Sequence, residues 1–248
     1  MKACLHDFVP SERELYDVCV SCGTFYSTVA PLAAEVYTQD YWTPERGHST
    51  LEEQVHNCEK HLEGGTSKND FLLKRIAVQD RDGALEIGCA PGALIRRLSD
   101  VGFHDVRGID PCLPDSYEIM PGGRSSIGVI NGIFPAIADT RLRSHPISDA
   151  RAQFSLIVAS DVFEHSHEPE AFLLECARLL KPGGQLLMML PLVGLGDIPE
   201  RMFNPQEHVY LHSADNLTAM LADAGFHSTA YDRWCAGHDT VSARRGAV

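Results

Sequence analysis

Short runs of consecutive apolar residues alternate with longer amphipathic segments along the C-terminal two thirds of the chain. The runs expected to form strands are 84–87, 106–109, 128–130, 154–159 and 185–190, and the segments expected to form helices are 93–101, 168–180 and 213–224. Runs that are apolar on both faces are typical of strands in a sheet covered by helices on both sides. The alternation therefore predicts an α/β fold built on a parallel, doubly wound sheet.

The segments on either side of this pattern have a different character. Segments 226–234 and 239–244, joined by a short Cys-Ala-Gly-His link, predict a closing β-hairpin. Upstream, the stretch 49–80 predicts two helices separated by a Gly-Gly pair, with Ser67 as the cap of the second helix.

The first 45 residues are rich in cysteine and weakly periodic, which is typical of a small module held together by something other than an apolar core. We expect this module, residues 1–45, to be followed by a helical linker or cap over 46–66 and by the α/β domain over 67–248. Within that domain, residues 191–213 are expected to form an insertion that covers the substrate site.

The amino-acid composition favours a globular protein and disfavours membrane and nucleic-acid partners. Of 248 residues, 44% are hydrophobic and 22% are charged, as in an ordinary soluble globular protein. The sequence has neither a run of about 18 apolar residues nor a basic and then apolar leader, so we expect a cytoplasmic protein with no membrane partner. The 21 basic and 34 acidic residues give a net charge of −13, which disfavours nucleic-acid partners in the absence of a dense Lys/Arg run. Composition does not predict the oligomeric state.

A loop rich in small residues follows the first predicted strand. It has the sequence Gly-Cys-Ala-Pro-Gly over 88–92, is preceded by Glu86, and leads into a predicted helix. Small residues let a ligand approach the backbone, and the free N–H groups at a helix start favour ligand binding there. Asp110, 22 residues beyond Gly88, ends the second predicted strand, where one carboxylate can accept hydrogen bonds from both hydroxyls of a ribose. The same loop also suits a turn required only for packing.

Four motifs follow one another along the chain. They are Leu85-Glu86-Ile87-Gly88-Cys89-Ala90-Pro91-Gly92, Gly108-Ile109-Asp110, Ser160-Asp161-Val162-Phe163-Glu164-His165 and Leu179-Leu180-Lys181-Pro182-Gly183-Gly184. In order and spacing they resemble the motifs of class I S-adenosylmethionine-dependent methyltransferases, most closely a subgroup with an Asp-Val-Leu/Phe-Glu-His segment. The resemblance covers about residues 67–248. It implies a Rossmann-like, doubly wound sheet of seven strands that is mostly parallel and ends in a hairpin.

The resemblance also implies where S-adenosyl-L-methionine binds. Glu86 and the loop residues Gly88, Ala90 and Gly92 would hold its methionine end, and Asp110 its ribose hydroxyls. Ser160 and Asp161 would line the sulfonium side. The family often has an acid for the adenine amino group after the third strand, whereas this chain has Ile-Asn-Gly-Ile-Phe over 130–134, so we expect backbone and Ile133 or Phe134 contacts there.

Carboxylates and histidines gather around the expected acceptor opening. Asp161, Glu164 and His165 follow the fourth predicted strand, and His208 lies in the later insertion. Three roles fit these residues. They suit a second divalent metal held by Asp161, Glu164, His165 and His208, which would activate a substrate hydroxyl. They equally suit a histidine general base with Glu164 beside it, or hydrogen bonds that only fix the loop.

The N-terminal cysteines predict a second type of site. Cys4-x-His6 and Cys19-x-x-Cys22-Gly, with 12 residues between the pairs, supply four ligands for a closed structural zinc site. Unmetallated core cysteines, redox use and an iron site are the alternatives. The module resembles the truncated zinc ribbon that precedes some sugar and natural-product methyltransferases. It is expected to roof the substrate cleft, with candidate substrate contacts from Tyr37, Tyr41, Trp42 and His48.

We therefore expect an enzyme that transfers a methyl group from S-adenosyl-L-methionine to a small polar molecule. A hydroxyl of a sugar or natural product is favoured, and a carbon or nitrogen acceptor stays open. One rival is a non-catalytic, zinc-bearing interaction module with a degenerate methyltransferase domain. The other is a nicotinamide-dependent oxidoreductase, which is weaker because the loop is Gly-x-Ala-x-Gly and not Gly-x-Gly-x-x-Gly.

Overall fold

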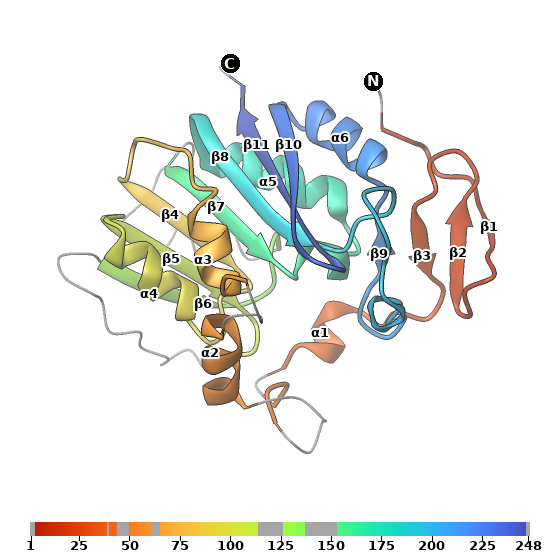
Figure 1. Cartoon of the computed structure of the whole chain (residues 1–248), viewed down its shortest axis with the longest axis horizontal. Helices are drawn as coiled ribbons and strands as arrows, with labels where there is room; N and C mark the ends of the chain where they lie inside the picture. The colour runs from red at the N-terminus through yellow and green to blue at the C-terminus, as the bar shows by residue number, and fades with distance from the viewer. Residues whose placement is uncertain are drawn as a thin grey trace.

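Seven strands form the central sheet in the order β10-β11-β8-β7-β4-β5-β6 (Figure 1). Their bounds are β4 Gly83–Ile87, β5 Asp105–Asp110, β6 Ser126–Asn131, β7 Phe154–Ser160, β8 Leu180–Leu190, β10 Phe226–Cys235 and β11 His238–Arg245. The pairs β4–β5, β4–β7, β5–β6 and β7–β8 are parallel, whereas β11 pairs antiparallel with both β8 and β10. The computed structural model describes residues 3–38, 40–43, 50–60, 65–113, 126–136 and 153–246. The predicted mostly parallel sheet with a C-terminal hairpin is confirmed.

Helices cover both faces of this sheet. Their bounds are α1 Ala33–Val36, α2 Leu51–Glu59, α3 Lys68–Leu73, α4 Ala93–Asp100, α5 Pro169–Leu179 and α6 Ala214–Asp223, with short 3-10 turns η2 Phe163–His165 and η3 Glu200–Met202. The Ser67 hydroxyl accepts a hydrogen bond from the Asp70 N–H, so Ser67 is the cap expected at the start of α3.

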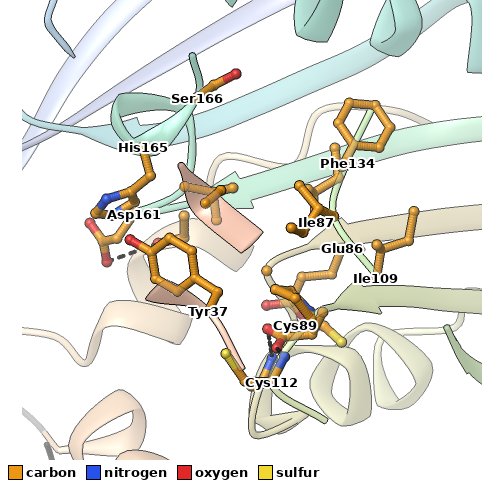
Figure 2. A pocket seen from close by; sticks show the side chains of 18 of the residues that line it. Tyr37, Glu86, Ile87, Cys89, Ile109, Cys112, Phe134, Asp161, His165 and Ser166 are labelled. Carbon is orange, nitrogen blue, oxygen red and sulfur yellow. Dashed lines mark hydrogen bonds between the residues drawn. The ribbon is translucent and has the colours of Figure 1, made fainter. Parts of the chain in front are cut away.

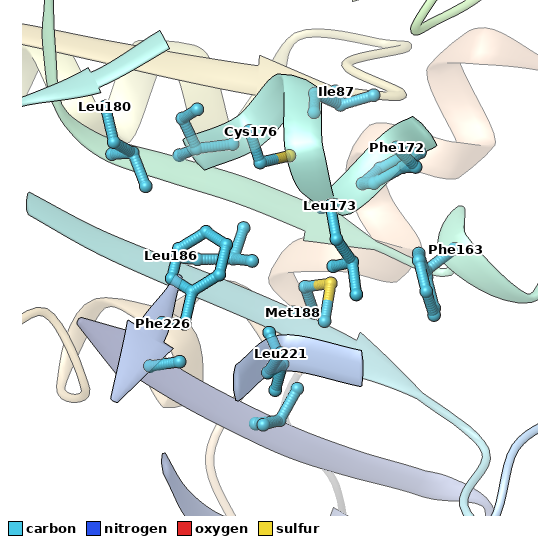
Figure 3. Packing of buried hydrophobic residues seen from close by; sticks show 14 of the residues in the cluster. Ile87, Phe163, Phe172, Leu173, Cys176, Leu180, Leu186, Met188, Leu221 and Phe226 are labelled. Atoms are coloured by element: carbon cyan, nitrogen blue, oxygen red, sulfur yellow. The ribbon is translucent and has the colours of Figure 1, made fainter. Parts of the chain in front are cut away.

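Alternate strand residues face opposite helix layers, and both sets are apolar. On one face, strand residues including Ile87, Leu186 and Met188 pack against Phe172, Leu173 and Cys176 of α5 and Leu221 of α6 (Figure 3). On the other face, the strand residues Ala84, Leu156, Val158, Leu187 and Met189 pack against Phe71 and Leu72 of α3 and Leu94, Ile95 and Leu98 of α4. Each fully buried Leu, Ile or Phe contributes about 1.5–3 kcal/mol from transfer alone, so this two-sided core fixes the sheet that carries the site.

The carboxyl ends of the parallel strands define where the pocket lies. Because β7, β4, β5 and β6 run parallel, the loops after Ile87, Asp110, Asn131 and Ser160 all leave the same edge of the sheet. The chain winds from β4 to β5 and β6 in one direction and to β7 in the other, so the strand order reverses at β4. Ligands of open α/β sheets bind at this reversal.

A second, smaller sheet lies beside the main domain. It has the order β1-β2-β3-β9, with β1 Phe8–Pro10, β2 Tyr16–Cys19, β3 Phe25–Ser27 and β9 Tyr210–Leu211. Its fourth strand therefore comes from the segment expected to cover the substrate site, more than 180 residues downstream of β3. This pairing ties the two predicted modules together, which no local pattern in the sequence indicates.

Two local expectations differ from the structure. Strand β8 begins at Leu180 and not at 185, because Pro182 and Gly183-Gly184 lie inside an irregular strand start, with a register shift opposite Phe154 and Leu156. The expected contact His48 lies outside the described residues. Among the described residues, no helix is long and apolar enough to cross a membrane.

Candidate active site

The turn between β4 and α4 requires glycine at both ends. Gly88 has φ +72° and Gly92, the N-cap of α4, has φ +88°, both in the left-handed region. A Cβ on Gly88 would lie 2.3 Å from Cγ2 of Val162, so the turn packs directly against the loop after β7. The glycines thus let the backbone of 88–92 pass between the sheet and the start of a helix of eight residues, whose N–H groups favour a polar ligand.

Asp110 sits at the end of β5 and binds backbone on both sides of the pocket. Its Oδ2 accepts a hydrogen bond from Ala90 N–H at 2.9 Å, and its Oδ1 accepts one from Cys112 N–H at 2.8 Å. Burial raises the pKa of this carboxyl, and the two backbone N–H groups oppose the rise. Each carboxylate oxygen has a further lone pair, so Asp110 can accept hydrogen bonds from a ligand diol in addition.

Glu86 presents an unsatisfied oxygen. It is 6% exposed at the end of β4 and lines the pocket, and among the described residues its Oε2 has no hydrogen-bond partner. Burial and then the nearby Asp110 raise its pKa, whereas Lys68 lowers it. A buried carboxylate oxygen without a donor costs free energy, so this position suits a ligand that donates a hydrogen bond or carries a positive charge.

Lys68 is the site residue that the sequence analysis missed. At the first position of α3, its ammonium lines the pocket and forms an ion pair with Asp161, the residue that follows β7 with φ +55°. Burial lowers the Lys68 pKa, but Asp161 outweighs it and raises that pKa to about 12. A cation in the first turn of a helix opposes the helix dipole, and that conflict is the signal by which the sequence could have indicated Lys68.

A single cavity of about 620 Å³ connects these groups. Its floor comes from the ends of β4, β5, β6 and β7, and its roof from residues 32–37, Tyr41 and Trp42 together with Gln54 and Cys58 of α2. Figure 2 shows Tyr37 between Asp161 and His165 on one side and Glu86 and Cys112 on the other. The Tyr37 hydroxyl is buried, and the described residues offer it no hydrogen-bond partner. The cavity has the size of a small-molecule site and includes Tyr37, Tyr41 and Trp42, the expected contacts.

Glu164, His165 and His208 come together next to this cavity. One ligand atom from each lies within 4.8 Å of the others, and the distance from His165 Nε2 to Glu164 Oε1 is 4.0 Å. His165 Nδ1 lies 2.9 Å from the Glu207 carbonyl oxygen, and His208 Nδ1 lies 2.7 Å from that of Met202. Since a carbonyl only accepts, both Nδ1 atoms carry the proton and both Nε2 atoms keep a free lone pair.

Burial sets the protonation of these groups. It raises the pKa of Glu164 to about 8, helped by the charge of Asp161, and it lowers the pKa of both His165 and His208. Both imidazoles are therefore neutral near pH 7, the form needed by a base or a metal ligand. Asp161 does not join this group, because its carboxylate is ion-paired with Lys68.

The site residues expected from the sequence divide into those that line the cavity and those that do not. Eight of them line the cavity: Glu86, Gly88, Ala90, Asp110, Ile133, Ser160, Asp161 and His165. Three do not line it: Gly92 caps α4, and Glu164 and His208 lie behind His165. Phe134, expected near the adenine, also lines the cavity and is 7% exposed.

The N-terminal Cys/His cluster is compact. Ligand atoms of Cys4, His6, Cys19 and Cys22 lie within 4.8 Å of one another, with 3.5 Å from Cys4 Sγ to Cys19 Sγ and 3.6 Å from Cys22 Sγ to His6 Nδ1. Four ligands at tetrahedral zinc distances lie about 3.5–3.8 Å apart. The donor set fits zinc, and the Cys4–Cys19 and Cys22–His6 distances already match the spacing of ligands around one ion.

Comparisons with known proteins agree with this geometry. A family model described as "Methyltransferase domain" matches residues 67–230. The ubiquinone biosynthesis O-methyltransferase of Xylella fastidiosa (strain M23) is 28% identical over 207 residues, which cover 77% of this chain and 75% of the relative.

Two solved structures share the fold. Burkholderia thailandensis 1,6-didemethyltoxoflavin-N1-methyltransferase, solved with bound 1,6-didemethyltoxoflavin and S-adenosylhomocysteine, superposes with a TM-score of 0.56 at 16% identity, covering 92% of this chain and 98% of that one. Human N-acetylserotonin methyltransferase in complex with SAM gives a TM-score of 0.55 at 16% identity over 73% of this chain, which spans about half of that enzyme (52%). With the family match, the reversal point at β4 and the cavity between Glu86 and Asp110, the chain belongs to the class I S-adenosylmethionine-dependent methyltransferases.

Proposed function

We propose that this methyltransferase transfers the methyl group to an oxygen of a small polar acceptor, and that Glu164, His165 and His208 act at that oxygen. The observation that carries the proposal is the pair of Nε2 lone pairs, each fixed by a backbone carbonyl at Nδ1. His165 lines the cavity, and His208 and the buried Glu164 carboxyl group lie next to it. The name of the Xylella relative, an O-methyltransferase, supports an oxygen acceptor.

The cofactor would lie along the ends of β4, β5 and β6. The unsatisfied Glu86 oxygen and the Lys68 ammonium suit the amino and carboxylate groups of its methionine end, next to the 88–92 turn. Asp110 would accept from the ribose hydroxyls, and Ile133 and Phe134 would contact the adenine. When bound, S-adenosyl-L-methionine supplies a methyl group already activated on a sulfonium. The protein then has to align the acceptor and exclude water, and the cover that Tyr37, Tyr41 and Trp42 form over the cavity suits this task.

The acceptor oxygen must lose a proton, and the cluster offers two ways to assist. A neutral His165 or His208 can take the proton directly through Nε2. Alternatively, a divalent metal on Glu164, His165 and His208 would lower the pKa of the hydroxyl, and backbone carbonyls at both Nδ1 atoms are the usual support of metal-bound histidines. Turnover of protein that holds only the one zinc ion of the N-terminal cluster distinguishes the two roles, because only the second role requires a further divalent metal.

Turnover tests the proposal. The purified protein and S-adenosyl-L-methionine are incubated with hydroxylated phenols, sugars and polar natural products, and release of S-adenosylhomocysteine is measured. We expect an O-methylated product, and we expect His165→Ala and His208→Ala each to lower kcat about 100-fold or more. His104→Ala, an exposed histidine at the other end of the sheet, is the control. Variants within about threefold of wild type would contradict the roles of His165 and His208.

The N-terminal cluster is proposed to hold one structural zinc ion. The supporting facts are four N/S ligand atoms within 4.8 Å of one another and a small sheet of three- and four-residue strands joined by the two-residue β9. We expect one zinc per chain by elemental analysis, and its loss in the double variant Cys19→Ser/Cys22→Ser. Cys58→Ser, which changes a cysteine outside the cluster, is expected to keep the metal. Unchanged zinc in the double variant would overturn the assignment.

A further inference from the structure

The Cys/His cluster is linked to the active site through residues 205–213. Thr24 follows the Cys19-x-x-Cys22 turn and is fully buried. Its Oγ1 lies 3.4 Å from Cys22 Sγ and accepts a hydrogen bond from Ser213 N–H at 3.1 Å. Ser213 is the N-cap of α6, so one end of the 205–213 segment is hydrogen-bonded directly to the residue that follows the Cys19-x-x-Cys22 turn.

Two further hydroxyls from the small sheet hold the rest of the segment. Ser27 Oγ donates to the Pro205 carbonyl at 2.7 Å, and Ser27 N–H donates to the Val209 carbonyl at 2.9 Å. Tyr16 Oη donates to the carbonyl of His208 itself at 3.1 Å. Tyr16 and Ser27 are each 2% exposed, so water does not compete for these hydrogen bonds.

The same segment carries His208 and the Glu207 carbonyl, which lie next to the cavity-lining His165. Strand β9 pairs with β3 through Tyr210 and Leu211 (Figure 1), starting two residues after His208. On the other side, the Glu207 carbonyl accepts from His165 Nδ1, and the His165 and His208 rings lie 4.9 Å apart. The position of His208, and of the Glu207 carbonyl that accepts from His165, therefore depends on a two-residue strand, which has no stability apart from the sheet it joins.

We propose that Tyr16 and Ser27 are positioning residues for His208, and that metal in the Cys4/His6/Cys19/Cys22 site is coupled through them to the geometry of the active site. The inference rests on the proposed role of His208. Strands β1 to β3 have only three or four residues each, so metal binding supplies much of the free energy that orders them. Loss of metal then loosens β3, releases β9 from its partner, and frees His208 from the Tyr16 hydroxyl.

Amide hydrogen exchange of the full chain tests this coupling without an acceptor. Zinc-loaded protein is compared with protein treated with a chelator, and binding of S-adenosylhomocysteine is titrated in the same samples. We expect exchange over 205–213 to become at least tenfold faster without zinc, while affinity for S-adenosylhomocysteine changes less than twofold. Unchanged exchange over 205–213 in zinc-free protein would overturn the coupling. Failure of the zinc-loaded protein to bind S-adenosylhomocysteine would instead refute the proposed function.

Removal of the Tyr16 hydroxyl alone distinguishes a positioning role of Tyr16 from loss of the whole N-terminal module. Tyr16→Phe keeps the ring that packs edge-on against Phe25 and Phe203 and removes only the hydrogen bond to the His208 carbonyl. We expect full zinc content with exchange at least threefold faster over 205–213. Tyr26→Phe, on the neighbouring strand, is the control, since the described residues show no hydrogen bond from its hydroxyl to 205–213. Equal exchange in the two variants would refute positioning by Tyr16.

Discussion

Lys68 and Asp161, 93 residues apart in the sequence, form an ion pair that lines the cavity. Lys68 starts α3 and Asp161 directly follows β7, so the pair joins a helix of one layer to a strand end of the sheet. His238, the first residue of β11, places its Nε2 3.8 Å from Asp161 Oδ1 and brings a third element to the same carboxylate.

Removal of the Lys68 charge should weaken cofactor binding. In Lys68→Met the Asp161 carboxylate loses its main partner and the cavity loses the cation nearest Glu86. We expect the Kd for S-adenosylhomocysteine to rise at least tenfold, about 1.4 kcal/mol, and the free energy of unfolding to fall by about 1–3 kcal/mol. Lys74→Met, six residues further along at the exposed C-cap of α3, should leave both unchanged. Equal affinities of the two variants would show that Lys68 does not contribute to the site.

Gly88 should tolerate no side chain. In Gly88→Ala the new Cβ meets Val162 Cγ2 at 2.3 Å and the residue keeps φ +72°. Gly102→Ala is a matched control, because Gly102 has φ +98° and nothing within 4 Å of the built Cβ. We expect chemical denaturation to show that the free energy of unfolding falls by about 1–2 kcal/mol in the control and by at least about 1 kcal/mol more in Gly88→Ala. Cofactor affinity should fall only in Gly88→Ala, and a fall in both would point to a general effect.

His212 should make the protein sensitive to acid. It is fully buried between Phe163 and Tyr210, neither ring nitrogen has a partner among the described residues, and burial lowers its pKa from 6.5 to about 3. The unfolded chain therefore binds a proton that the folded chain excludes. The free energy of unfolding should fall by about 1.4 kcal/mol per pH unit between about pH 6 and pH 3, and recover as the pH rises.

The variant His212→Phe removes that titration and keeps an aromatic ring in the stack. Denaturation at several pH values should show a shallower acid slope than wild type and equal or higher stability at pH 7, because two unpaired buried nitrogens are gone. His104→Phe, at an exposed position, should keep the wild-type slope. An unchanged slope in His212→Phe would show that other groups cause the acid sensitivity.

The features that could be predicted from the sequence are those that depend only on residues close together along the chain. The two-sided apolar runs of β4 and β7, the cap at Ser67 and the turn at 88–92 each follow from a few consecutive side chains. The irregular start of β8 was missed because Pro182 and Gly183-Gly184 suggest a turn before a strand.

Contacts between distant segments could not be predicted in the same way. The Lys68–Asp161 ion pair and the pairing of β3 with β9 join residues that only the completed fold brings together. Asp161 was expected to share a metal with Glu164, His165 and His208, but its carboxylate is ion-paired with Lys68 and does not join their cluster. A single sequence contains no periodicity that reports such pairings.

Calorimetric titration of the zinc-loaded protein with S-adenosylhomocysteine tests the central claim most directly. The account predicts micromolar binding at one site per chain. Asp110→Ala, which removes the carboxylate that accepts from Ala90 and Cys112, should weaken binding at least tenfold, about 1.4 kcal/mol, whereas Asp100→Ala at the exposed end of α4 should not. A well-folded wild-type protein that binds no S-adenosylhomocysteine would contradict the account and favour a non-catalytic interaction module.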